Sequence, residues 1–141
     1  MKPVYLLDTN IISESSKSIP NKKVIDRLTE YDGLCAISST VWQEIIYGYE
    51  NMVAGRKKSF IGDWLRDVKD SYQILPYDSF AAQICGDLRS RCEKKGKTLP
   101  ICDSQIAATA IANCMVLITH NTTDFKEITE NSMLKIEDWF E

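Results

Sequence analysis

The stretch VYLLDTN, residues 4–10, decides how the rest of the chain can fold. Four apolar residues, Val4 to Leu7, lead directly into the carboxylate of Asp8. An unbroken apolar run bounded by turn-forming residues is typical of a strand buried on both faces, as in a parallel sheet. Asp8 could cap the turn that follows, because aspartate is a good N-cap residue. Capping alone does not explain why the strand carries no polar residue before its last position.

Further apolar runs alternate with amphipathic segments along the chain. Strands are expected at 3–8, 33–38, 72–77 and 115–119, with a short fifth strand at 134–138. Helices are expected at 21–31, 40–52, 56–70, 78–96 and 100–114, after a helical turn at 10–15. This alternation predicts a single domain over residues 1–141, built as a three-layer α/β/α sandwich on a mostly parallel central sheet of four to five strands.

The composition excludes several classes of protein. The chain has 141 residues, a net charge of −3 and five cysteines without a CxxC pair, which argues against a disulfide framework and against a thiolate zinc site. It contains neither an apolar run long enough to span a membrane nor a signal-peptide pattern, so we expect a cytoplasmic protein. The negative charge argues mildly against a nucleic-acid binder, unless several acids share a metal ion that cancels their charge.

Four acidic residues fall where strands end or helices begin: Asp8, Glu44, Asp103 and Asp124. In a parallel sheet these positions meet at the carboxyl edge, where α/β proteins bind their ligands. Two carboxylates 4 Å apart repel by roughly 4 kcal/mol at an effective dielectric of 20. Such a group therefore calls for a cation or for raised pKa values. Oxygen ligands suit Mg²⁺ or Mn²⁺, which support phosphodiester hydrolysis.

Two of these acids have structural alternatives on their helices. Glu44 could be a solvated helix residue, although Val41 and Gly48 on its flank suggest that another element approaches closely. Asp103 could serve the helix dipole or a cap. It shares a face with apolar residues such as Ile106, however, and a carboxylate on an apolar face needs a partner.

Other motifs narrow the chemistry. Asp124 and Glu127 have the spacing of a capping box, which is the structural alternative for Asp124. His120 is the only histidine, so a two-histidine ribonuclease mechanism is excluded, and we interpret it as an ordinary loop residue. Neither G-x-S-x-G nor a nucleotide-binding glycine motif occurs.

Most basic residues are expected on solvated helix faces, although one or two clusters could follow a nucleic-acid backbone. The clusters are Lys22–Lys23, Arg56–Lys58 and 89–97.

Four motifs together resemble those of the PIN-domain ribonucleases, most closely the VapC-type toxins of bacterial toxin–antitoxin pairs. They are YLLDTNII (5–12), SSTVWQEIIYG (38–48), LPICDSQIAATA (99–110) and LITHNTTDF (117–125). Each motif is a modest signal, but four in the right order and spacing are a strong one, and the resemblance runs along essentially the whole chain.

The resemblance implies a Mg²⁺- or Mn²⁺-dependent endoribonuclease whose acidic site maps onto the same four residues. Asp8 and Asp103 look like the main metal ligands, Glu44 like a ligand through water or an orienting group, and Asp124 like a ligand of a second or weaker metal position. As supporting residues, Thr119 and Asn121 look like holders of metal-bound water and of Asp124, and Asn10 looks like a brace of the loop. Attack by water implies products with 5′-phosphate and 3′-hydroxyl ends.

The same resemblance implies partners besides the RNA substrate. Such toxins form homodimers and bind a small VapB-type antitoxin, and they contact operator DNA only through that antitoxin. No membrane association is implied. The antitoxin lays a helix or an extended tail into a groove beside the acids. Four apolar residues could line such a groove or belong to the core: Ile11, Ile12, Trp42 and Tyr47.

Two other hypotheses compete with a nuclease. A PIN-like module that holds RNA or a partner without cutting it is disfavoured by the complete set of four acids. A phosphotransfer domain with Asp8 as the phosphoacceptor would need an acidic pair at the first strand and a lysine after the last core strand. Neither feature stands out in the sequence.

Overall fold

The central sheet begins with the opening apolar run. Across residues 2–141, which the computed structural model describes, five strands pair in the order β3-β2-β1-β4-β5, and every pairing is parallel. The strands are β1 (Tyr5–Leu7), β2 (Cys35–Ser38), β3 (Gln73–Leu75), β4 (Val116–Ile118) and β5 (Ile136–Glu137). The predicted fold class is confirmed, and each strand lies within its predicted range.

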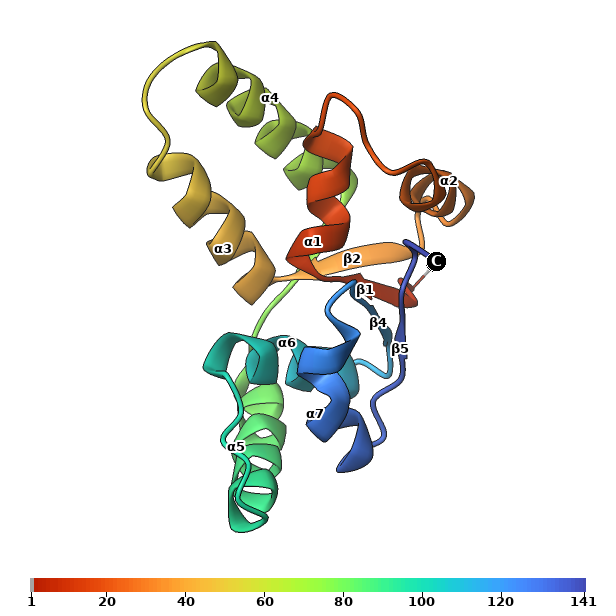
Figure 1. Ribbon diagram of the computed structural model, residues 1–141, viewed down its shortest axis with the longest axis vertical. Helices are drawn as coiled ribbons and strands as arrows, with labels where there is room; N and C mark the ends of the chain where they lie inside the picture. Colours follow the sequence, from red (N-terminus) through yellow and green to blue (C-terminus); the bar gives the residue numbers. More distant parts are fainter. Residues whose placement is uncertain (1) are drawn as a thin grey trace.

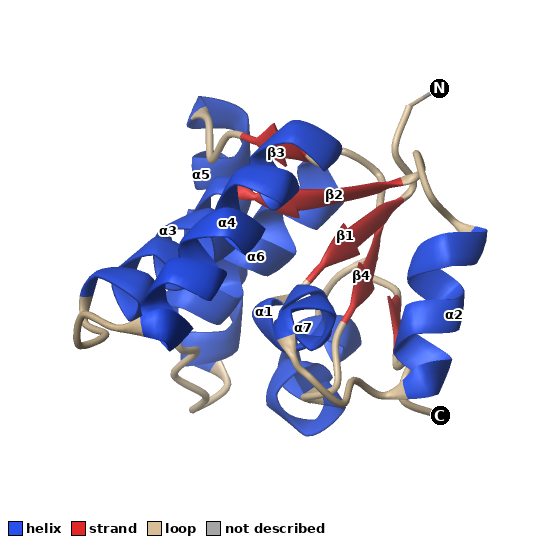
Figure 2. Ribbon diagram, turned by 90° about the horizontal axis from the view of Figure 1, so that it is seen from above, coloured by secondary structure: helices blue, strands red, loops and turns tan. Residues whose placement is uncertain are grey.

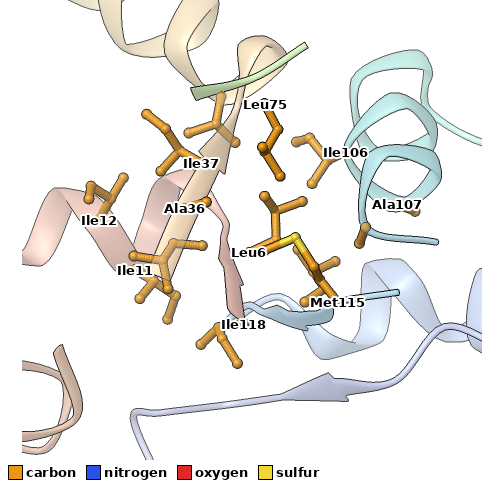
Figure 3. Packing of buried hydrophobic residues seen from close by; sticks show 14 of the residues in the cluster. Leu6, Ile11, Ile12, Ala36, Ile37, Leu75, Ile106, Ala107, Met115 and Ile118 are labelled. Atoms are coloured by element: carbon orange, nitrogen blue, oxygen red, sulfur yellow. The ribbon is translucent and has the colours of Figure 1, made fainter. Parts of the chain in front are cut away.

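Helices cover both faces of the sheet (Figures 1 and 2). They are α1 (Thr9–Ile12), which continues into the 3₁₀ turn η1 (Ser13–Ser16), then α2 (Lys22–Glu30), α3 (Ser39–Glu50), α4 (Arg56–Ser71), α5 (Ser79–Lys94), α6 (Ile101–Ala112), the 3₁₀ turn η2 (Thr122–Phe125) and α7 (Lys126–Glu130). Figure 3 shows Ile11 and Ile12 on one side of the central strands, and Ile106 and Ala107 on the other. These two packed layers complete the predicted sandwich.

The strand register aligns the carboxyl edge. Leu7 lies opposite Ile118 in the β1–β4 pair, and the Asp8 amide extends that ladder by donating to the Ile118 carbonyl at 2.9 Å. On the other side of β4, the Thr119 amide donates to the Glu137 carbonyl at 3.0 Å. The residues that follow β1 and β4 are therefore held side by side by backbone hydrogen bonds.

Helices α3 and α6 are fixed at the same edge. The Ser38 hydroxyl caps α3 by accepting from the Val41 amide at 3.1 Å. The Thr40 hydroxyl donates to the Gln105 side chain of α6 at 3.2 Å. These bonds hold in place the two helices that carry Glu44 and Asp103.

The structure corrects three expectations. Ile11 and Ile12 are fully buried, so they belong to the core and cannot line a groove, because α1 turns its apolar face onto the sheet. Gly48 is exposed, and a Cβ at this position would meet nothing within 4 Å, so it does not permit the close approach that the sequence suggested. Helix α7 was not predicted, because its segment carries few apolar residues.

The five cysteines are free; three are buried as small core residues, whereas Cys102 and Cys114 are exposed. Within residues 2–141, no helix is long and apolar enough to cross a membrane.

Candidate active site

Asp8 is a buried carboxylate whose two oxygens accept different hydrogen bonds. Its side chain is only 5% exposed. Oδ1 accepts from the Thr9 amide at 2.8 Å, which makes Asp8 the N-cap of α1. Oδ2 accepts from the Thr119 hydroxyl at 2.8 Å and, at 3.4 Å, from the Asn10 amide. Burial raises the pKa of Asp8, and the charge of Glu44 raises it further, although these hydrogen bonds favour the ionised form. The capping role is real, but it uses only one of the two oxygens.

Glu44 is connected to the same corner through Thr9. The Thr9 hydroxyl donates to Glu44 Oε2 at 2.7 Å, while the Thr9 amide caps Asp8. One residue of α1 thus joins acids that lie 36 positions apart in the sequence. The interpretation of Glu44 as a solvated helix residue is wrong, because its carboxylate is half-buried and bonded to a neighbouring element.

Asp103 experiences the charges of all three other acids. It lies in the first turn of α6, but the N-cap of that helix is Pro100, and no side chain caps it. Burial raises the pKa of Asp103 to about 6, with further contributions from the charges of Asp8, Asp124 and Glu44. Asp103 is repelled by three like charges, and a divalent cation bound there would relieve this repulsion.

Asp124 lies in η2 and is exposed. The capping-box interpretation of this residue is wrong, because α7 has Phe125 as its N-cap and lacks a side-chain cap. Asp124 is nevertheless near enough to raise the pKa of Asp103. Within residues 2–141, no group of three acidic, thiol or imidazole side chains is close enough together to hold a metal ion without other ligands. The donor set is the oxygen-rich kind that suits Mg²⁺, which keeps several of its waters.

Among the supporting residues, Thr119 contacts a different acid from the one expected, whereas Asn10 joins two loops, as expected of a brace. Thr119 is fully buried and donates to Asp8 rather than holding Asp124. The Asn121 amide donates to the Thr119 hydroxyl at 3.0 Å, whereas its side chain is exposed. The Asn10 side chain accepts from the His120 amide at 3.0 Å, so it links the loops that follow β1 and β4.

Two residues near the acids were missed from the sequence. Thr9 is not among the residues that the sequence singles out, yet it connects Asp8 to Glu44. Its position directly after the strand-ending acid was the available signal. Cys102 lies close to Glu44: desolvation raises the pKa of its thiol most, and the nearby Glu44 carboxylate raises it further. Its position beside Asp103 at a helix start was the only indication.

We expect Thr119→Val to destabilise the fold by about 1.5–3 kcal/mol, because it removes a hydrogen bond to a buried charge. Thr119→Ser keeps the hydroxyl and is the matched control, expected to lose less. Urea unfolding at pH 7 measures both variants. Equal stability of the valine and serine variants would show that the hydroxyl contributes nothing to holding Asp8.

The fold and the site define an α/β/α protein whose sheet edge gathers four carboxylates. The PIN domain family matches residues 5–131. The tRNA(fMet)-specific endonuclease VapC of Shigella flexneri is 29% identical over 136 residues, 96% of this chain and 97% of that protein. Toxin FitB of Neisseria gonorrhoeae is 32% identical over 128 residues, 86% of this chain and 91% of that protein.

Solved structures agree with these sequence matches. FitAcB from Neisseria gonorrhoeae superimposes with a TM-score of 0.85 at 27% identity, covering 97% of this chain and 99% of that one. VapBC2 from Rickettsia felis, bound to a DNA fragment from its promoter, gives a TM-score of 0.81 at 28% identity, with 99% of both chains covered. The chain belongs to the PIN-domain family, in its VapC group.

Proposed function

We propose that the protein is a Mg²⁺- or Mn²⁺-dependent endoribonuclease and the toxin of a toxin–antitoxin pair, acting in the cytoplasm. The observation that carries this is the position of Asp103, where burial first and then the charges of Asp8, Asp124 and Glu44 raise its pKa to about 6. Helix capping accounts for only one oxygen of Asp8, and it accounts for neither Asp103 nor Asp124, since α6 and α7 lack side-chain caps. Relatives named as ribonucleases and endonucleases support the reaction class.

The surroundings of each residue suggest its role in the site. Asp8 and Asp103 would hold the metal, with Glu44 and Asp124 at its flanks. Bound there, the metal would activate water and neutralise charge on the phosphoryl oxygens. Thr9 and Thr119 fix Asp8 and Glu44 through three hydrogen bonds of 2.7–2.8 Å. Burial of Asp8 at the end of a rigid strand keeps its oxygens in one orientation.

An antitoxin partner is supported by an exposed apolar surface. A hollow of about 710 Å³ lies between the segment after η1 and helix α4, and Ile19 and Phe60 line it. Tyr47 on α3 is 71% exposed, and Trp42 is half-buried. Exposed apolar surface of this kind marks interaction sites. We propose that a VapB-type antitoxin covers this surface, that the protein forms a homodimer, and that operator DNA is contacted only through the antitoxin.

The function is tested by sequencing RNA 5′ ends after the protein is induced in cells. New ends carrying 5′-phosphate are expected at a small set of positions, and none are expected with Asp8→Asn. Ends that appear equally with both proteins would contradict the proposal. RNA binding without any new ends would instead favour a non-catalytic PIN-like module.

Metal binding has a readout that does not depend on activity. We expect Mn²⁺ to bind the wild-type protein at pH 7 and Asp103→Asn to bind it at least tenfold more weakly, because one charged ligand is lost. Asp78→Asn is the matched control, since Asp78 caps α5 by accepting from the Ala81 amide, and asparagine caps equally well. Titration followed by electron paramagnetic resonance measures all three proteins. Equal Mn²⁺ affinity for all three would contradict a metal site at Asp103.

A further inference from the structure

The loop after β4 carries an aromatic pair that the catalytic proposal does not use. The rings of His120 and Phe140 are stacked, with centroids 4.0 Å apart and planes inclined by 27°. Phe140 covers one face of the imidazole, while the His120 side chain remains 51% exposed. We propose that this pair is a platform on which one base of single-stranded RNA stacks beside the acidic edge. The proposal rests on the proposed ribonuclease function and adds a contact for its substrate.

The imidazole is fixed before any ligand arrives. His120 Nδ1 lies 3.0 Å from Asp138 Oδ2. Because a carboxylate only accepts hydrogen bonds, Nδ1 is the atom that carries the hydrogen. Asp138 Oδ1 accepts from the Phe140 amide at 2.9 Å, which closes the unit on itself. A ring held in this way loses little conformational entropy when a base stacks on it.

The platform is mounted on the core. Trp139, between Asp138 and Phe140 in sequence, is 1% exposed. Its ring contacts those of Tyr5 and Tyr31 at centroid distances of 5.3 and 5.6 Å. The segment after β5 is therefore an anchored support rather than a loose end of chain.

The platform lies next to the acids. The His120 amide donates to Asn10 Oδ1 at 3.0 Å, and Asn10 in turn donates to Asp8 at 3.4 Å. The preceding residue, Thr119, donates directly to Asp8. His120 is thus one hydrogen-bonded link away from the acids, within reach of a nucleotide that flanks a phosphate held there.

The two ring types of the platform favour an RNA base as the ligand. Unpaired bases of single-stranded RNA stack on histidine and phenylalanine, and such stacking tolerates different sequences. Glu14, which lies close to His120, forms an ion pair with Lys17, whose side chain is 58% exposed. Lys17 thus offsets the charge of Glu14, while Asp138 is held by the imidazole, so the platform offers a stacking surface rather than a positive patch.

The test pairs a protein change with the removal of one base. Binding of a short oligoribonucleotide in Mg²⁺ is measured by fluorescence anisotropy in an Asp103→Asn background, which prevents cleavage. His120→Ala is expected to weaken binding about five- to twenty-fold, with an unchanged salt dependence, because stacking releases no counterions. His120→Phe keeps the ring and is expected to stay within about threefold of the histidine protein.

Abasic substitutions scanned along the RNA locate the stacked base. At one position, removing the base is expected to cause no further loss of affinity in the His120→Ala protein. At the other positions, the loss of affinity from removing the base should add to the loss from His120→Ala. Phe80→Ala, which removes an exposed aromatic ring on α5, is the control and should show no coupling at that position.

The outcomes separate this proposal from the function on which it rests. RNA binding with purely additive losses at every position would overturn the platform alone. A Phe variant as weak as the alanine variant, although equally stable to heat, would overturn stacking and indicate a polar contact. Failure to bind any RNA, together with the absence of new RNA 5′ ends in cells that express the wild-type protein, would overturn both the platform and the ribonuclease proposal.

Discussion

Asp8→Asn should abolish RNA cleavage, with a loss of about 10³-fold or more, while the fold survives. A metal ion contributes several kcal/mol to stabilising a phosphoryl transition state, and each 1.4 kcal/mol corresponds to a factor of ten in rate. The asparagine oxygen can still accept from the Thr9 amide, so the cap of α1 is retained. Only the negative charge and one acceptor toward Thr119 and Asn10 are lost.

Cleavage of a labelled RNA by purified protein in Mg²⁺ measures this effect. Asp78→Asn is again the matched control, because Asp78 also follows a strand and caps the next helix but is exposed. Its activity should stay within about twofold of the wild type. Undiminished cleavage by a folded Asp8→Asn protein would remove Asp8 from the catalytic group and leave it as a cap.

The strands could be predicted because burial on both faces leaves a direct mark on the sequence. Leu6, Leu7, Ala36 and Ile37 are fully buried, and each belongs to an unbroken apolar run. The acids could be located at the edge for the same reason, since the ends of those runs are visible. The partners of the acids could not be predicted, because the bond from Thr119 to Asp8 depends on the register of β1 against β4.

Two features lie in polar segments and could not be predicted: the burial of Glu14 and helix α7. Glu14 lies in the run SESSKS, which reads as surface, yet it is only 3% exposed. Burial would raise the pKa of Glu14, but the hydrogen bond and charge of Lys17 and the amide of Asn21 outweigh it, so the pKa is lowered. Helix α7 was missed similarly, since Phe125 and Ile128 are the only buried residues in η2 and α7. In both places tertiary packing determines the burial, and local periodicity carries no signal of it.

Asp103→Asn should make the metal-free protein more stable at pH 7 while it removes activity. The folded-state pKa of Asp103, about 6, is above the ordinary value of an aspartate. The folded protein therefore binds this proton more tightly than the unfolded chain, and stability falls as the pH rises from about 4 to 6. The full penalty is present at pH 7. Asparagine removes it, for an expected gain of about 1–2 kcal/mol after allowance for solvent screening.

Urea unfolding with a chelator present, at pH 7 and at pH 4, checks the sign. The gain should be present at pH 7 and largely lost at pH 4, where Asp103 is protonated in the folded state and about half protonated in the unfolded chain. Asp67→Asn on the exposed face of α4 should change the free energy of unfolding by less than about 0.5 kcal/mol at either pH. A gain of the same size at both pH values would mean that the amide packs better than the acid, rather than that the burial and repulsion of an ionised Asp103 are relieved. A gain confined to neutral pH would show that the fold bears an electrostatic cost at the position where the metal is expected to bind.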